Sequence, residues 1–144
     1  MNKTNSKRIL SAILCMVLIA ALALMATGCS AARIPNDGAG KEQAISLGEG
    51  ATQFYFTVID LEGDTTWYDV QTDKTVVGDA LLDLKLIEGY ESTYGLYVTT
   101  VNGITVDYDK DGKYWAFYVD GEYATAGVDS TAIEAGKTYT CKAE

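Results

Sequence analysis

The residues from Asp107 to Gly112 reproduce the D-x-D-x-D-G spacing that opens a calcium-binding loop. Such a loop completes its oxygen ligands with a bidentate carboxylate at the twelfth position. Tyr118 occupies that position here, and a neutral phenol cannot replace a carboxylate. A turn between two strands also favours Asp and Gly for conformational reasons alone. We therefore predict a solvated turn and no metal site.

The sequence also offers no clear set of side chains for a catalytic site. The sequence contains no histidine, which excludes Ser-His-Asp and Cys-His catalysis and any imidazole ligand for zinc or cobalt. Two carboxylates that share acid-base work need environments that separate their pKa values. Carboxylates at turns and strand edges are normally just solvated, so we predict that the protein is not an enzyme and requires no cofactor. The acidic residues considered for this role are Asp60, Glu62, Asp64, Asp69 and Asp73.

The charge of the chain excludes one class of partner. It has 20 acidic and 11 basic residues and a net charge of −9. No basic cluster with interleaved aromatic residues is present, and an acidic surface repels phosphate. We therefore predict that the protein does not bind nucleic acid.

The N-terminus has the pattern of a bacterial lipoprotein signal. Basic residues between Lys3 and Arg8 precede an apolar run from Ile9 to Ala26, and small residues then lead to Cys29. We predict a signal peptide over residues 1–28, lipidation of Cys29, and an extracytoplasmic domain held to the cell membrane by its lipid. An uncleaved signal anchor is the alternative, because the apolar run is long enough to span a bilayer.

The remaining thiol and the next segment carry less information. Cys141 lies in an alternating strand pattern, and we predict a buried, unreactive thiol. Residues 29–52 mix Gly, Ala, Ser and charged residues around Pro35, the single proline, without a sustained period. This composition predicts a flexible tether that begins at the lipidated Cys29.

The folded domain is predicted over residues 53–144. Residues 53–59 are apolar on both faces of a strand, which indicates a central position in a sheet, and residues 66–70 pair back after a turn at 62–64. Apolar residues at 77, 80, 81 and 84 form one stripe of an amphipathic helix. We predict Thr75 as its N-cap and Gly89 as its end.

Two dipeptides predict hairpins. Asn102-Gly103 separates strands at 96–101 and 104–108, and Asp120-Gly121 separates two aromatic runs within residues 113–128. Both central positions of a type I′ turn need a positive φ, which these residues tolerate. With a last strand at 137–143, the order is β-β-α-β-β-β-β. The fold class is therefore α+β, a mainly antiparallel, sandwich-like β domain whose helix covers one sheet face.

The order of motifs resembles the C-terminal β-domain of the transcobalamin and intrinsic factor cobalamin carriers. The matching segments are Val77–Leu82, Tyr94–Val98, Asn102–Ile104, Tyr114–Phe117, Gly121 and Gly127–Val128. The resemblance implies a binding protein that captures cobalamin or a related corrinoid outside the cell and passes it to an importer. A surface module that binds a protein or glycan, without corrinoid activity, is the alternative function.

The resemblance also points to the residues that would meet the ligand. A corrinoid is a broad disc with amide arms, so its receptor needs a flat apolar face and backbone groups for the amides. Trp115 and Phe117 share one strand face, and we expect that face to be open to the ligand. The other predicted contacts are Leu96 and Val98 as a floor and Gly127 and Val128 as a point of close backbone approach.

Overall fold

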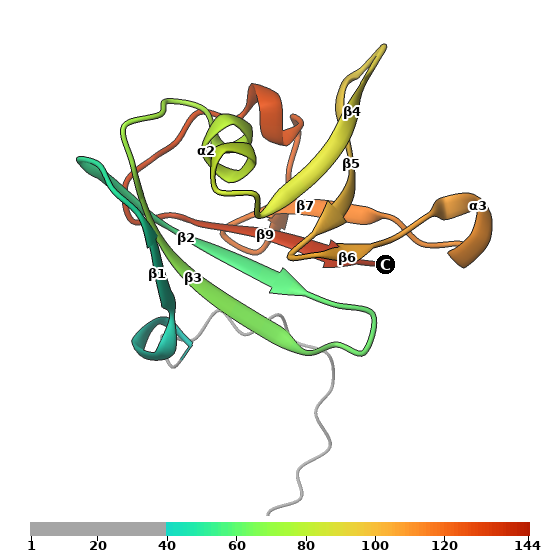
Figure 1. Ribbon diagram of the computed structural model, residues 1–144, viewed down its shortest axis with the longest axis horizontal. Coiled ribbons are helices and arrows are strands. Elements are labelled where there is room, and N and C mark those ends of the chain that lie inside the picture. The colour runs from blue at the N-terminus through green and yellow to red at the C-terminus, as the bar shows by residue number, and fades with distance from the viewer. Residues whose placement is uncertain (1–39) are drawn as a thin grey trace, which may run out of the picture. The chain divides into compact units, whose positions relative to one another are not determined.

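The computed structural model describes residues 40–144, so the predicted signal peptide and Cys29 lie outside the described residues. The described chain is mainly β, with two sheets and one main helix (Figure 1). The strands are β1 (Ile45–Gly48), β2 (Thr52–Ile59), β3 (Thr65–Thr72), β4 (Ile87–Ser92), β5 (Gly95–Val101), β6 (Ile104–Thr105), β7 (Trp115–Val119), β8 (Glu122–Tyr123) and β9 (Thr138–Ala143). The helical segments are η2 (Lys41–Gln43), α2 (Val77–Asp83), α3 (Tyr108–Asp111) and η3 (Val128–Ser130).

The larger sheet has six strands in the order β1-β3-β2-β9-β7-β8. β2 lies between β3 and β9, which confirms its predicted central position, and Phe54, Phe56 and Val58 on one of its faces are buried. Most neighbours are antiparallel, as predicted, but β1 runs parallel to β3 and β9 runs parallel to β2. The final strand thereby joins the β2–β3 hairpin to β7.

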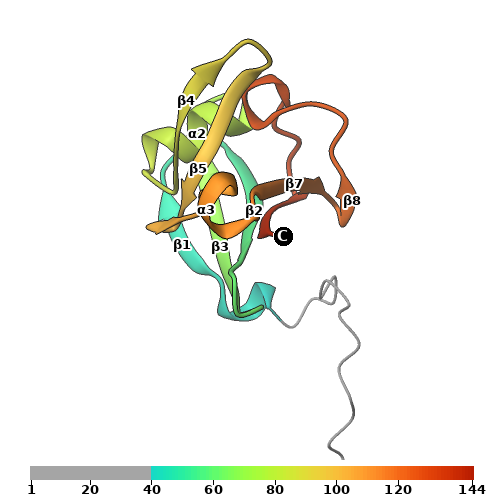
Figure 2. The same ribbon diagram turned by 90° about the vertical axis from the view of Figure 1, so that its right-hand side faces the viewer.

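The smaller sheet has the order β4-β5-β6. Its β4–β5 hairpin lies beside α2 and stands away from the larger sheet (Figures 1 and 2). Both predicted type I′ turns are present, because Asn102, Gly103, Asp120 and Gly121 have φ values of 52°, 77°, 50° and 85°. The strands that follow these turns have two residues each and are shorter than predicted.

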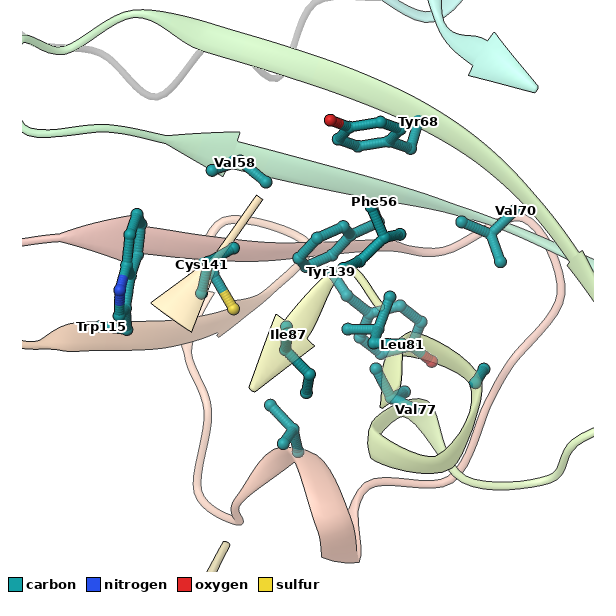
Figure 3. Close-up of a cluster of buried hydrophobic side chains, with 14 of the residues drawn as sticks. Phe56, Val58, Tyr68, Val70, Val77, Leu81, Ile87, Trp115, Tyr139 and Cys141 are labelled. Atoms are coloured by element: carbon teal, nitrogen blue, oxygen red, sulfur yellow. The ribbon is translucent and has the colours of Figure 1, made fainter. Parts of the chain in front are cut away.

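The helix α2 covers one face of the larger sheet, as predicted (Figure 3). Its buried residues Val77, Ala80 and Leu81 pack in the same core cluster as Phe54 and Tyr139. The rings of Phe54 and Tyr139 meet edge to face with centroids 5.4 Å apart. This core holds β9 and, paired with it, β7, which carries Trp115 and Phe117.

Both predicted ends of the helix were wrong. Val76, in extended conformation, is the N-cap residue and pairs with Ala132, so Thr75 does not cap. The helix ends at Asp83 because Lys85 takes the left-handed conformation, with φ of 56°. Gly89 instead lies in β4.

Part of the predicted tether belongs to the sheet. β1 pairs with β3 in the register Ile45↔Tyr68, and η2 precedes it. Only Leu47 in β1 is even half-buried, so its side chains give no alternating apolar pattern. Its place in the sheet comes from backbone pairing. Within residues 40–144, no helix is long and apolar enough to cross a membrane.

Candidate ligand-binding cavity

A cavity of about 340 Å³ lies where β5 of the smaller sheet approaches β7 of the larger one. The segment 124–128 after β8 forms its third wall. We call this hollow the β5–β7 cavity. All six residues predicted as ligand contacts line it, namely Leu96, Val98, Trp115, Phe117, Gly127 and Val128. The remaining lining residues are Tyr97, Tyr114, Tyr123, Ala124, Thr125 and Ala126.

The β7 wall presents an unpaired strand edge to the cavity. Tyr114 and Glu144 exchange both backbone hydrogen bonds, at 2.9 and 3.0 Å, so Tyr114 faces β9. In an antiparallel ladder the next residue points its backbone groups the opposite way. The backbone N–H and C=O of Trp115 therefore face away from β9, and β8 pairs only with Tyr118 and Val119. No hydrogen-bond partner of these two groups is found within residues 40–144.

The Trp115 side chain does not form the open ligand face that was predicted for it. Only 7% of it is exposed, and it belongs to the hydrophobic core cluster (Figure 3). Its ring shares the core face of β7 with Phe117, whose ring stacks on Tyr139 at 6.2 Å. The physical reason is that alternation assigns residues to a face, whereas the packing of other elements decides whether that face is covered.

The indole of Trp115 nevertheless keeps a polar group unused. Its N–H is buried and has no hydrogen-bond partner among the described residues. A buried donor without a partner is rare in proteins and costs about 1–3 kcal/mol. The indole N–H is therefore an unused donor on a residue that lines the cavity.

Three tyrosines on the walls of the cavity were not among the predicted contacts. Tyr123 and Tyr97 are 58% and 38% exposed, and the Tyr114 hydroxyl lies 3.4 Å from that of Tyr123. This hydrogen bond is the largest cause that raises the pKa of Tyr114 to about 12, so its phenol is neutral at physiological pH. The preference of tyrosine for wet binding faces was the available signal.

Asp129 holds two walls of the cavity together. Its Oδ2 accepts a hydrogen bond from the backbone N–H of Leu96 at 3.1 Å, which ties η3 to β5. A Cβ atom on Gly127 would lie 2.6 Å from Asp129 Oδ1. Gly127 therefore makes room for this carboxylate, a role different from the predicted approach to ligand. Val128 is 3% exposed and anchors the segment in the core.

The calcium-like sequence forms the short helix α3 and its cap. Asp107 Oδ1 accepts the N–H of Asp109 at 3.0 Å, and Asp111 Oδ2 accepts the N–H of Asp107 at 2.8 Å. The hydrogen bond from Lys110 is the largest cause that lowers the pKa of the Asp107 carboxyl. In residues 40–144 no group of three or more acidic or cysteine side chains is placed to hold a metal ion.

Residues 73–143 match a family model described as Domain of unknown function (DUF4430). The match contains every residue that lines the β5–β7 cavity. A search of curated proteins gives no match.

Two solved structures are similar to this chain. A candidate metal binding protein from Ruminococcus gnavus ATCC 29149 has 26% sequence identity and a TM-score of 0.62, covering 65% of this chain and 97% of its own. Haptocorrin in complex with Cbi has 17% identity and a TM-score of 0.54. That match covers 68% of this chain but only 26% of haptocorrin, so the shared feature is the fold of one part of that protein.

The lining of the cavity suits noncovalent binding. It combines aliphatic and aromatic side chains with the unpaired backbone edge of β7, a composition typical of small-molecule sites. The titratable side chains among its lining residues are tyrosines. Such a lining would suit an uncharged, partly apolar ligand with hydrogen-bonding groups.

Proposed function

We propose that this protein binds a corrinoid, cobalamin or a relative, in the β5–β7 cavity. The observation that carries the proposal is the convergence of all six predicted contact residues on one cavity. One of them, Trp115, also has an indole N–H without a partner in residues 40–144. The shared fold with haptocorrin, solved in complex with Cbi, supports the ligand class.

The geometry favours the edge of the corrinoid over its flat face. Trp115 is buried and cannot stack on a large disc, and a cavity of about 340 Å³ is near the lower limit of small-molecule sites. The amide arms at the corrin periphery are small enough to enter. A carbonyl oxygen on such an arm accepts from the Trp115 N–H, while the apolar rim of the ring rests on the exposed Tyr97 and Tyr123.

Calorimetry with cobalamin tests the proposal directly. The Ala126→Trp variant places a large side chain on an exposed lining position and is expected to abolish the binding heat. Ala135→Trp adds the same side chain at an exposed position that does not line the cavity, so it should bind like the parent protein. Absence of binding to the parent at millimolar cobalamin, or equal affinities of the two variants, contradicts the proposal.

The proposed setting is the outer side of the cell membrane. Lipidation of Cys29 would hold the domain there, where it would capture ligand and deliver it to an importer. Growth of the producing cells with a labelled fatty acid should label the parent protein but not a Cys29→Ser variant. Labelling that survives this substitution would contradict the anchor.

A surface module that binds a protein or glycan is the second candidate. The observation that favours it is the number of tyrosines that are more than one-third exposed, which are Tyr90, Tyr94, Tyr97, Tyr108 and Tyr123. Tyrosine is enriched at protein interfaces. Capture of a macromolecular partner by a protein that gives no heat with cobalamin would select this function.

A further inference from the structure

A second cavity, of about 240 Å³, lies between the β4–β5 hairpin and α3. Three tyrosines contribute to its lining, Tyr90 from β4, Tyr97 from β5 and Tyr108 from α3. The segment that contains α3 leaves the smaller sheet after β6 and reaches the larger sheet at β7 (Figures 1 and 2). Chain topology therefore brings aromatic residues from three elements to one hollow. We call it the tyrosine cavity.

These aromatic rings remain accessible. Tyr90, Tyr97 and Tyr108 are 58%, 38% and 61% exposed. The rings of Tyr90 and Tyr97 lie against each other with centroids 5.3 Å apart and planes tilted by 39°. The face of an aromatic ring carries partial negative charge, so several ring faces around one hollow attract a cation.

The charged residues at the same cavity strengthen that preference. Asp107 and Asp109 both line it, and the Asp107 carboxylate already pairs with the Lys110 ammonium at 2.8 Å. No hydrogen bond or ion pair involves the Asp109 carboxylate within residues 40–144. Lys110 also interacts electrostatically with Asp109, but its single ammonium cannot balance both lining carboxylates, so a net negative charge remains beside the three tyrosines and an anionic ligand would be repelled.

We propose that the tyrosine cavity binds a small organic cation of the alkylammonium class. Alkyl groups on nitrogen spread the charge and weaken its hydration, so such a cation gains from contact with ring faces while Asp109 balances its charge. A primary ammonium is held more strongly by water and gains less from the rings. The proposal concerns a cavity separate from the β5–β7 cavity and does not depend on corrinoid binding, although Tyr97 lines both.

Nuclear magnetic resonance of the isotope-labelled protein tests the proposal, with tetramethylammonium as the probe. We expect saturable shifts confined to the residues of the tyrosine cavity. tert-Butanol is the matched control, because it has nearly the same shape without the charge, and it should cause no saturable shifts there. Equal responses to the two probes, or tetramethylammonium shifts at other sites only, would overturn the proposal.

Single substitutions locate the site. Tyr90→Leu and Tyr108→Leu each remove one accessible ring and should weaken tetramethylammonium binding about 2- to 5-fold. Tyr94→Leu is the control, because Tyr94 lies in the same hairpin, is 97% exposed and does not line the cavity. A similar loss in all three variants, or no loss in the first two, would refute the site.

Charge is tested separately. Asp109→Asn should weaken binding of the probe, and the difference from the parent should shrink in high salt because exposed charges are screened. Asp83→Asn removes the same charge at an exposed position at the end of α2 and should leave binding unchanged. Saturable binding of a neutral oligosaccharide at these tyrosines, with none of tetramethylammonium, would assign the cavity to glycans and overturn the proposal.

Discussion

Replacement of Trp115 by Phe separates a binding role of its indole from a structural one. The substitution removes the N–H and the larger ring but keeps an aromatic side chain on β7. The N–H is buried without a partner in the described structure, so its removal relieves a cost of about 1–3 kcal/mol. The smaller ring loses apolar contact in the core, which costs about 1–2 kcal/mol.

These two effects on stability oppose each other. We expect the free energy of unfolding, measured by urea denaturation without ligand, to change by less than about 1.5 kcal/mol. Affinity for a corrinoid should respond more clearly, because the bound acceptor loses its donor. A hydrogen bond contributes about 0.5–1.5 kcal/mol, so the dissociation constant measured by calorimetry should rise about 2- to 12-fold.

Trp67→Phe provides the matched control. Trp67 is also buried, at 8% exposure, but lies on β3 and does not line the β5–β7 cavity. This variant should bind cobalamin with the affinity of the parent protein. If Trp115→Phe instead lowers stability by several kcal/mol and leaves affinity unchanged, Trp115 serves only the core and the role assigned to its N–H is wrong.

Three further substitutions or measurements probe the structure. Asp129→Ala removes the acceptor of the Leu96 N–H, so the free energy of unfolding should fall by about 1 kcal/mol in urea denaturation, and cobalamin affinity should fall with it. Unchanged values in both assays would show that Asp129 does not position the cavity walls. Burial raises the pKa of the Cys141 thiol from 9.0 to about 12, so a thiol reagent at pH 8 should modify Cys141 only after unfolding. The free energy of unfolding should also decline as pH rises above 9.0, because the thiol ionises first in the unfolded chain. Rapid native reaction would contradict this. Gly89→Ala places a Cβ against the carbonyl oxygen of Tyr97 and should destabilise the fold by about 1–3 kcal/mol. An unchanged urea midpoint would refute that contact.

Local signals made the hairpins predictable. Asn102-Gly103 and Asp120-Gly121 fix their turns through the backbone conformations that each pair tolerates, which requires no knowledge of the rest of the chain. The apolar residues of β2 likewise predicted a strand with neighbouring strands on both sides.

The missed features depend on distant contacts. β1 is a four-residue strand with mostly exposed side chains, so its pairing with β3 leaves no hydrophobic pattern. The end of α2 is set by Lys85, a residue type that gives no strong stop signal. Gly89 lies in β4, where the Tyr97 carbonyl approaches too closely across the β4–β5 pair for a residue with a Cβ.

Only part of the candidate site could be predicted from the sequence. The order of motifs predicted six residues as ligand contacts, and these six residues line one cavity. Sequence alone could not show that the core covers Trp115, or that Asp129 reaches the Leu96 backbone from 33 positions away. Tertiary packing decides both, and alternation along a strand does not encode it.

The position of β9 has a consequence for how the protein is made. β9 lies between β2 and β7, so strand pairing joins β1, β3 and β2 to β7 and β8 through residues 138–143. During synthesis the ribosome therefore releases nearly the whole domain before its central seam can close. The larger sheet therefore cannot close before residues 138–143 have left the ribosome.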